Sequence, residues 1–401
     1  MRFPITPGST KYKMRVILIS AVYPPEPVVS AQISNDLYNK MKSKGWVVKV
    51  LCPLPSRPKD FVFNNYYDNP DIKRISSFKS PNSKIITRSF ESLSFGIKAS
   101  IYLLKNRKEF DKIYVNSWPF FSQIIIGLTA FLIRKKRILH VMDIYPEALK
   151  LKNKLVEKVL IYFDSKILTL YNQSICIGES QVSYLSRTRN IPLESFTHIN
   201  LWSSVSEFSL PTNRPLNNKL EVLYFGNVGP LANLDRILDG IYFYEKEVSF
   251  NLTIAGSGSA LKNLKNKVKK YDLKNVCFKV VPAGDEEKVF LNADIAYLGQ
   301  KPNTGNTSIP SKIILYMMAR KVILADVDEG SLVQKLIKQY DCGFWVNSNS
   351  SSSKLIDQIE KISKEKSRVL KLKQQNAYNC YTDIFKKETN INKIIDLIEN
   401  F

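Results

Sequence analysis

The sequence predicts an α/β fold made of two Rossmann-like domains, each a doubly wound parallel sheet, facing each other across a cleft. Short apolar strand segments alternate with amphipathic helical segments along the whole chain. The 401 residues are enough for two domains, and the 44% apolar and 24% charged residues are typical of a packed globular protein. The second half repeats the pattern of the first after a predicted linker over 192–207.

The first domain is expected to span residues 14–205. Its strands are apolar runs that end at turn residues, predicted at 14–20, 46–51, 112–115, 138–142 and 174–177. Its helices carry apolar residues at helical spacing, predicted at 29–44, near 90–106, at 120–133 and near 151–170. Residues 54–85, rich in Asn, Pro, Asp and Ser, are expected to be irregular. Residues 1–13 do not resemble the start of a fold, so we expect a disordered leader or a true start at Met14.

The second domain is expected to span residues 206–384. Its strands are predicted at 220–226, 250–255, 275–280, 294–298, 321–325 and 343–346, with helices between them. The chain then ends in three helices, predicted at 354–365, 368–384 and 387–400.

The charge distribution points to an anionic partner of the first domain. The whole chain has a net charge of +23, and residues 1–200 hold 31 Lys and Arg against 14 Asp and Glu, which is +17 of it. Nucleic acid and an anionic membrane are both candidates for such a surface. The basic clusters are mixed with Phe95, Ile97 and Leu104, and no nucleic-acid motif accompanies them. The sequence therefore favours a membrane surface, with no nucleic acid expected.

The cysteines and histidines argue against a metal centre. The five cysteines are scattered without a CxxC pair, which favours a reducing compartment and excludes a disulfide framework. His140 and His198 are the only histidines, so no metal and no other cofactor are expected. No signal peptide is visible, and the apolar run at 120–133 is too short to span a bilayer. We therefore expect a cytoplasmic protein.

Two segments of the second domain predict a site for a nucleotide diphosphate. Gly226, Asn227 and Gly229 lie in a glycine loop directly after a strand, where a diphosphate can approach the backbone. Ser311 and Lys312 follow a proline at the start of an apolar helix, where free N–H groups and a positive charge would bind an anion. The glycine loop lacks the full GxGxxG pattern, and Gly256-Ser257-Gly258 also falls short of it, which argues against a nicotinamide or flavin dinucleotide site.

Polar residues at strand ends of the first domain are candidates for the acceptor side of a reaction. Asp143 and Glu147 follow the predicted strand 138–142 and could position or deprotonate a hydroxyl; alternatively, both stabilise the helix start near Pro146. His140 lies either toward the cleft or in the core. Glu26, in a stiff Pro-rich loop, either reaches the cleft or is structural.

The order of these segments resembles the retaining glycosyltransferases of the large "group 1" class, family 4, which have the GT-B fold. The closest resemblance is to the bacterial branch that builds O-antigen, capsule and colanic-acid-type polysaccharides. The resemblance covers about Met14 to Phe401 and rests on segments in matching order: YPPE (23–26), DIYPE (143–147), GES (178–180), YFGNVG (224–229), AGSG (255–258), NADIA (292–296), PSK (310–312) and EGS (329–331).

The resemblance implies a metal-independent hexosyl- or N-acetylhexosaminyltransferase. Its partners would be a nucleotide-diphosphate sugar and a polyprenyl-diphosphate-linked saccharide acceptor, at the cytoplasmic face of the plasma membrane. Gly226, Asn227 and Gly229 would contact the diphosphate, with Lys312 neutralising it as it leaves. The resemblance also implies that Glu329, Gly330 and Ser331 lie near the nucleotide or donor sugar, and that the helix at 385–401 packs back onto the first domain.

Some positions depart from the common family pattern. Two glutamates that many relatives carry are Thr307 and Leu315 here, and the frequent His-Asp pair is Met142-Asp143. Two other functions stay open from the sequence. One is a nucleotide-sugar epimerase of similar fold, and the other is a non-catalytic protein, either a degenerate transferase or a basic nucleic-acid binder.

Overall fold

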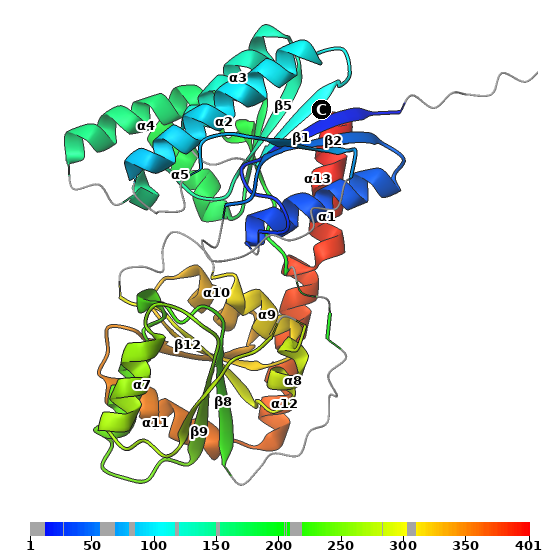
Figure 1. Ribbon diagram of the computed structural model, residues 1–401. Helices are drawn as coiled ribbons and strands as arrows, with labels where there is room; N and C mark the ends of the chain where they lie inside the picture. The colour runs from blue at the N-terminus through cyan, green and yellow to red at the C-terminus, as the bar shows by residue number, and fades with distance from the viewer. Residues whose placement is uncertain are drawn as a thin grey trace, which may run out of the picture. The chain divides into compact units, whose positions relative to one another are not determined.

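The computed structural model describes residues 13–26, 28–56, 69–79, 85–116, 120–149, 153–203, 205, 207–208, 219–282, 284–302 and 310–401 (Figure 1). The expected leader, apart from Lys13, and Thr307 lie outside these residues. The chain divides into two compact units. Unit 1 comprises residues 1–199 and 388–401, and unit 2 comprises residues 200–387.

Unit 1 contains a seven-stranded sheet, all of whose described pairs are parallel, in the order β3-β2-β1-β4-β5-β6-β7. Its strands are β1 (Arg15–Ser20), β2 (Val47–Pro53), β3 (Ile72–Ile75), β4 (Lys112–Asn116), β5 (Lys136–Val141), β6 (Gln173–Cys176) and β7 (Phe196–His198). Two of them correct the sequence analysis, because β3 lies in the segment expected to be irregular and β7 in the expected linker. Both are short edge strands with polar residues, which lack the apolar pattern of central strands.

Helices cover both faces of this sheet. The helices of unit 1 are α1 (Val29–Ser43), α2 (Ile85–Lys105), α3 (Phe121–Leu132), α4 (Lys154–Thr169), α5 (Glu179–Arg189) and α13 (Lys387–Asn400). Apolar residues of α2, α3 and α4 share one core with Ile17, Val115 and Leu139 of the sheet. At the other face, Ile398 of α13 lines a small cavity together with Tyr114. A 2.7 Å ion pair between Lys44 and Glu399 also ties the C-terminal helix to unit 1.

Unit 2 contains a six-stranded parallel sheet in the order β10-β9-β8-β11-β12-β13. Its strands lie close to the predicted positions: β8 (Leu220–Phe225), β9 (Phe250–Ala255), β10 (Val276–Lys279), β11 (Ile295–Gly299), β12 (Val322–Val327) and β13 (Gly343–Asn347). Successive strands are added on one side of β8 as far as β10 and on its other side from β11 onward, so the strand order reverses between β8 and β11. Open α/β sheets bind their ligands at the carboxyl ends of such strands.

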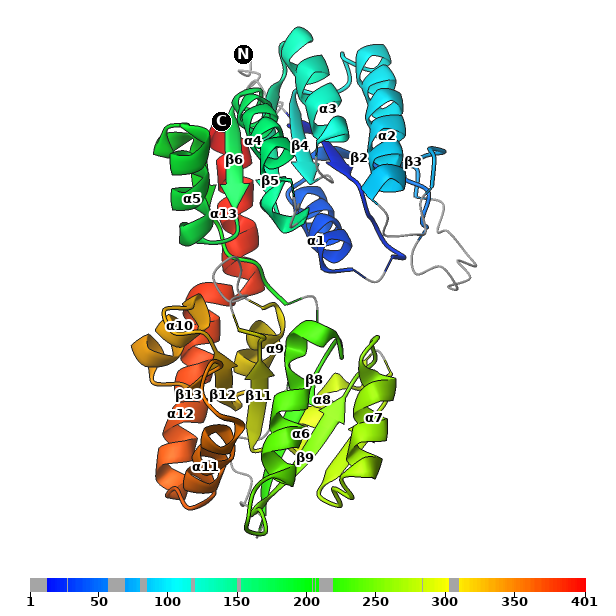
Figure 2. The same cartoon turned by 90° about the vertical axis from the view of Figure 1, so that its left-hand side faces the viewer.

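The two faces of this sheet have separate apolar cores, as expected for a doubly wound sheet. Figure 2 shows the helices that cover the sheet. Val322 and Leu324 of β12 face one core, whereas Ile323 and Ala325 face the other. The helices are α6 (Leu234–Tyr242), α7 (Leu261–Lys270), α8 (Glu286–Leu291), α9 (Lys312–Met318), α10 (Leu332–Tyr340), α11 (Ser352–Ser363) and α12 (Ser367–Cys380). In the described parts of the chain, no helix has the length and apolar content needed to cross a bilayer.

Candidate functional site

Two glycine loops of unit 2 pack directly on each other at the carboxyl ends of β8 and β9. Gly226 begins the first loop with φ +123°, and its N–H donates to the Ala255 carbonyl oxygen at 2.9 Å. A methyl group on Gly256, which has φ +142°, would lie 2.0 Å from the Gly226 carbonyl oxygen. Only glycine fits such a position, because a side chain would be strained by the backbone angle and would also collide with the neighbouring loop.

Lys312 reaches the first glycine loop from α9. Its Nζ donates to the Tyr224 hydroxyl and lies 4.2 Å from the centroid of that ring. A methyl group on Gly226 would contact its Cε at 3.7 Å. The lysine and the glycine loop, predicted separately from the sequence, therefore lie together.

Tyr316 fixes the position of α9 relative to β8. It follows Lys312 by one helical turn, so both side chains lie on the same side of the helix. Its hydroxyl accepts a hydrogen bond from the Phe225 N–H at 2.9 Å and donates to the Phe225 carbonyl oxygen at 3.0 Å. The lysine is thus held beside the last residues of β8.

The environment of Lys312 is suited to an anion. Among the described residues no carboxylate forms an ion pair with it. Burial lowers the pKa of its amine from 10.5 to about 8. Because α9 has only seven residues, we attribute the positive potential here to the amine rather than to a helix dipole, and the exposed Ser311 makes no capping hydrogen bond.

Glu329, Gly330 and Ser331 form the turn between β12 and α10. Ser331 is fully buried and its Oγ accepts a hydrogen bond from the Gln334 N–H at 3.3 Å, so it caps α10. Gly330, with φ +76°, donates its N–H to Gln334 Oε1 at 2.7 Å. Glu329 is exposed. The N–H groups of Gly330 and Ser331 and the serine hydroxyl therefore have partners near the turn, and the Glu329 side chain is the exposed polar group.

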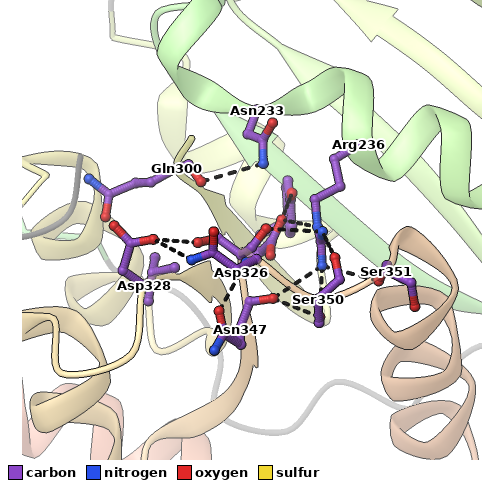
Figure 3. Close-up of polar contacts among 12 residues, drawn as sticks. Asn233, Arg236, Gln300, Asp326, Asp328, Asn347, Ser350 and Ser351 are labelled. Atoms are coloured by element: carbon purple, nitrogen blue, oxygen red, sulfur yellow. Dashed lines mark hydrogen bonds and ion pairs between the residues drawn. The ribbon is translucent and has the colours of Figure 1, made fainter. Parts of the chain in front are cut away.

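A buried polar cluster that the sequence analysis did not single out lies at the ends of β11, β12 and β13 (Figure 3). Asp326 of β12 is fully buried, accepts a hydrogen bond from the Tyr297 hydroxyl at 3.0 Å and lies 3.0 Å from Arg236 Nε. Burial raises the pKa of Asp326 to about 6 although Arg236 opposes the rise. Arg236 also donates to the carbonyl oxygens of Asn347 and Ser348 at 3.2 and 3.1 Å.

Through Arg236, this cluster joins the first turn of α6 to the loop that follows β13. Because α6 begins shortly after the glycine loop, the cluster also fixes the end of that loop. Asp328 contributes to it by accepting a hydrogen bond from Ser348 Oγ at 2.6 Å. The available signal was the pair Asp326 and Asp328 at the end of an apolar strand, because buried carboxylates at that place need a partner.

Asp143 is the predicted acceptor-side residue with the most open environment. It follows β5, its side chain is exposed, and no partner for it occurs in the described part of the chain. The surrounding protein nevertheless shields part of its carboxyl group from water, which raises the pKa of that group. A carboxylate in this state is a better base than an ion-paired one.

Glu147 is instead held in a structural ion pair, contrary to its predicted catalytic role. Arg189, which is buried, donates to both of its carboxylate oxygens, at 2.7 and 2.8 Å, and also to Asp164 at 2.8 Å. The Tyr184 hydroxyl donates to it as well, at 2.8 Å. These donors lower the pKa of Glu147 against the opposing effect of burial, and a stabilised carboxylate is a poor base.

His140 and Glu26 are also buried, which corrects the prediction that they contact an acceptor. His140 is 1% exposed and its Nδ1 lies 2.5 Å from the Tyr114 hydroxyl, so it belongs to the core of the sheet. Burial lowers its pKa to about 4. Glu26 is 5% exposed and accepts a hydrogen bond from the Ser56 N–H at 3.0 Å, which ties two loops together.

Comparisons with known proteins agree with this architecture. Residues 207–379 match the family "Glycosyl transferases group 1". The chain is 24% identical over 345 residues to the Pseudomonas aeruginosa protein named "Probable glycosyltransferase WbjE", which covers 81% of this chain and 84% of that protein.

Two solved structures have the same fold at low sequence identity. Anabaena HepE in complex with UDP has a TM-score of 0.69 at 13% identity, covering 97% of this chain and 100% of HepE. HepE has also been solved with UDP-glucose. The lipopolysaccharide outer core galactosyltransferase WaaB has a TM-score of 0.65 at 14% identity, covering 97% of this chain and 100% of WaaB.

Proposed function

We propose that this glycosyltransferase moves a sugar from a nucleotide-diphosphate sugar to a lipid-linked saccharide, with retention of the anomeric configuration. Residues 207–379 match the group 1 glycosyltransferase domain, and the chain has the GT-B fold. One observation carries the donor assignment. Lys312 is a desolvated amine without a carboxylate partner in the described structure, and it lies against the glycine loop that follows β8.

The proposed donor site uses this arrangement to bind and release a diphosphate. Gly226, Asn227 and Gly229 would contact the diphosphate through their backbone, with Ser311 and Lys312 beside it. As the bond between the anomeric carbon and the diphosphate oxygen breaks, negative charge grows on the leaving group. The ammonium group of Lys312 would stabilise that charge more than it stabilises the ground state. Glu329 would lie toward the nucleotide or sugar.

On the acceptor side we propose Asp143 as the residue that positions or deprotonates the attacking hydroxyl. The acceptor oxygen forms the new bond to the anomeric carbon while its proton passes to a base. Asp143 is exposed and its pKa is raised, whereas Glu147 is ion-paired. No metal is needed in this scheme because Lys312 supplies the positive charge.

The proposed acceptor is a polyprenyl-diphosphate-linked saccharide used in bacterial surface polysaccharide synthesis. The +17 charge of residues 1–200 favours binding to an anionic membrane surface, and we propose that this surface is the cytoplasmic face of the plasma membrane. The likeness to WaaB, a lipopolysaccharide galactosyltransferase, is consistent with this class of product. The epimerase and the non-catalytic protein considered from the sequence are not favoured, because the matched domain is a glycosyltransferase domain.

The test is thermal stabilisation by UDP, GDP, dTDP, CMP and their sugars, measured for the wild type and Lys312→Ala. HepE binds UDP and UDP-glucose, so the uridine nucleotides are the first to try. A ligand well above its dissociation constant should stabilise by about 2–4 kcal/mol. Lys312→Ala should lose this shift and about 10²-fold or more of the transfer rate.

A matched control is Lys267→Ala, since Lys267 lies in the same unit but pairs with Asp235 and Asp239 at 3.0 and 2.9 Å. It should keep the nucleotide shift. Wild-type transfer by Lys312→Ala would refute the role of Lys312, and the absence of any shift in the wild type would refute the nucleotide site.

A further inference from the structure

Helix α2 is apolar on two sides, only one of which is buried. Phe95, Ala99 and Leu103 pack into the core against the sheet. A second stripe recurs at helical spacing on another side and is exposed to solvent: Ile86 (71% exposed), Phe90 (58%), Ile97 (46%), Ile101 (47%) and Leu104 (44%). A helix at the surface of a soluble domain normally has a single apolar stripe, so the second one needs an explanation.

Helices α3 and α4 repeat this feature. Their exposed apolar residues also follow helical spacing and are Phe121 (42%), Leu128 (45%), Phe131 (57%) and Leu132 (73%) in α3, and Leu155 (72%), Val159 (48%), Tyr162 (59%) and Phe163 (51%) in α4. In each helix the residues buried in the core, such as Ile126, Ala130 and Ile167, lie at other positions of the helical turn. We call the exposed stripes of the three helices the α2–α4 outer face.

The three stripes form one surface because the helices cover the same face of the sheet. Figures 1 and 2 show α2, α3 and α4 in a row over unit 1. The first two helices are in close contact, since a methyl group on Gly96 would lie 2.7 Å from the Ser122 Cα atom. Contiguous apolar surface of this extent is rare on monomeric soluble proteins and marks a site of interaction.

The charges on these helices are nearly all positive. Exposed cations accompany the stripes: Lys98, Lys105, Arg134, Lys154, Lys158 and Lys166. The three carboxylates of the helices each have a basic partner: Glu91 pairs with Arg88 at 3.2 Å, Glu157 with Lys154 at 3.3 Å, and Asp164 with the buried Arg189 at 2.8 Å. The α2–α4 outer face is therefore both apolar and cationic.

We propose that the α2–α4 outer face is the surface with which this enzyme docks on an anionic lipid bilayer. The stripes would enter the boundary between headgroups and acyl chains, while the lysine side chains reach back to the phosphates. A second copy of the chain is a poorer occupant, because pairing two such faces would bring like charges together. The inference rests on the membrane-bound acceptor proposed above and identifies the part of the protein that meets the membrane.

The experiment is co-sedimentation of the full chain with vesicles of phosphatidylcholine, with and without about one third phosphatidylglycerol. The test variant is Ile97→Glu/Ile101→Glu/Phe131→Glu, whose side chains are solvent-exposed and not part of the core. The control is Phe243→Glu/Leu372→Glu, which changes residues of unit 2 that are 70% and 57% exposed. The wild type and the control should bind the anionic vesicles, and the test variant should bind about tenfold or more weakly.

Three results would overturn the proposal: a wild type that stays in the supernatant, a test variant that sediments like the wild type, or a wild-type dimer that the test variant converts to a monomer without any change in vesicle binding. Nucleotide-induced thermal stabilisation is measured on the same samples. If it is intact while vesicle binding fails, the docking surface is wrong and the donor site stands. If it is absent while vesicle binding succeeds, the donor site is wrong.

Discussion

At Lys312 an ammonium group has lost much of its water without gaining a carboxylate partner in the described structure. Its pKa of about 8 lies within the range where enzymes are assayed. A bound diphosphate would favour the charged form and raise this pKa, so binding and protonation are linked. The charge state of one residue should therefore control donor affinity.

We predict that the affinity for the nucleotide diphosphate falls as the pH rises through about 8. Above that value the amine is neutral in the free enzyme, and binding must also recapture a proton. Titration calorimetry over this range should show a roughly tenfold loss for each pH unit once the amine is neutral. Lys312→Arg should remove this dependence, since arginine stays charged. An affinity that is flat with pH in the wild type would contradict the assignment.

His140 gives a second prediction, concerning stability. Burial lowers its pKa from 6.5 to about 4, so between these values the unfolded chain binds a proton that the folded chain excludes. This contribution to stability is present above about pH 6.5 and is lost as the pH falls toward 4, amounting to about 2 kcal/mol between pH 7 and pH 5.

Urea unfolding of the wild type and His140→Gln at these two pH values measures the contribution. His140→Gln should lose less stability on acidification than the wild type does. Equal pH slopes in the wild type and His140→Gln would show that the ring is not excluded from protonation.

The residues that could be predicted are those with a local signal. The glycine loop and Lys312 each stand in a recognisable strand-turn or turn-helix segment, and the structure brings them together. Glu147 and Glu26 were misjudged because the groups that bind them, Arg189 and the Ser56 N–H, are 42 and 30 residues away in the sequence. Such partners depend on the tertiary fold, which a strand-end position does not reveal.

At the scale of elements, the proposed donor site depends on two loops that support each other. Besides the contact between Gly226 and Gly256, the Val228 N–H donates to the Ser257 carbonyl oxygen at 2.8 Å. A methyl group on Gly258 would lie 2.4 Å from the Val228 carbonyl oxygen. The loop after β9 therefore fixes the shape of the loop after β8, to which we assign diphosphate binding.

We predict that Gly256→Ala destabilises the protein by about 3 kcal/mol and abolishes nucleotide binding, because the added methyl group forces the loops apart. Gly284→Ala is the matched control, since Gly284 also has a positive φ, +95°, but no heavy atom within 4 Å of the added group. It should cost about 1 kcal/mol and leave nucleotide binding unchanged. Chemical unfolding and nucleotide titration distinguish the two variants. Normal binding by Gly256→Ala would show that the loops do not depend on each other.

The elements themselves were predictable where strands are central and apolar. All six strands of unit 2 lie close to their predicted positions. The central strands β11 and β12 are buried throughout, and burial on both faces requires continuous apolar runs. β3 and β7 of unit 1 are the exceptions, with the sequences IKRI and FTH. Edge strands need fewer apolar residues, so periodicity alone does not distinguish them from loops.

At the scale of the molecule, the two proposed binding surfaces belong to different units. The residues proposed to bind the diphosphate lie in unit 2, and the α2–α4 outer face lies in unit 1. The residues of each surface have their supporting contacts within their own unit. Damage to one surface is therefore expected to leave the binding activity of the other intact.

This separation predicts opposite defects in two variants. Lys312→Ala should bind anionic vesicles like the wild type but lose nucleotide binding. Ile97→Glu/Ile101→Glu/Phe131→Glu should bind nucleotide normally and transfer sugar normally to a short, water-soluble acceptor. With an acceptor embedded in vesicles, its rate at low enzyme concentration should fall about tenfold, because less enzyme reaches the membrane. If that variant were equally slow with the soluble acceptor, the outer face would affect catalysis itself, and membrane docking would not explain its apolar stripes.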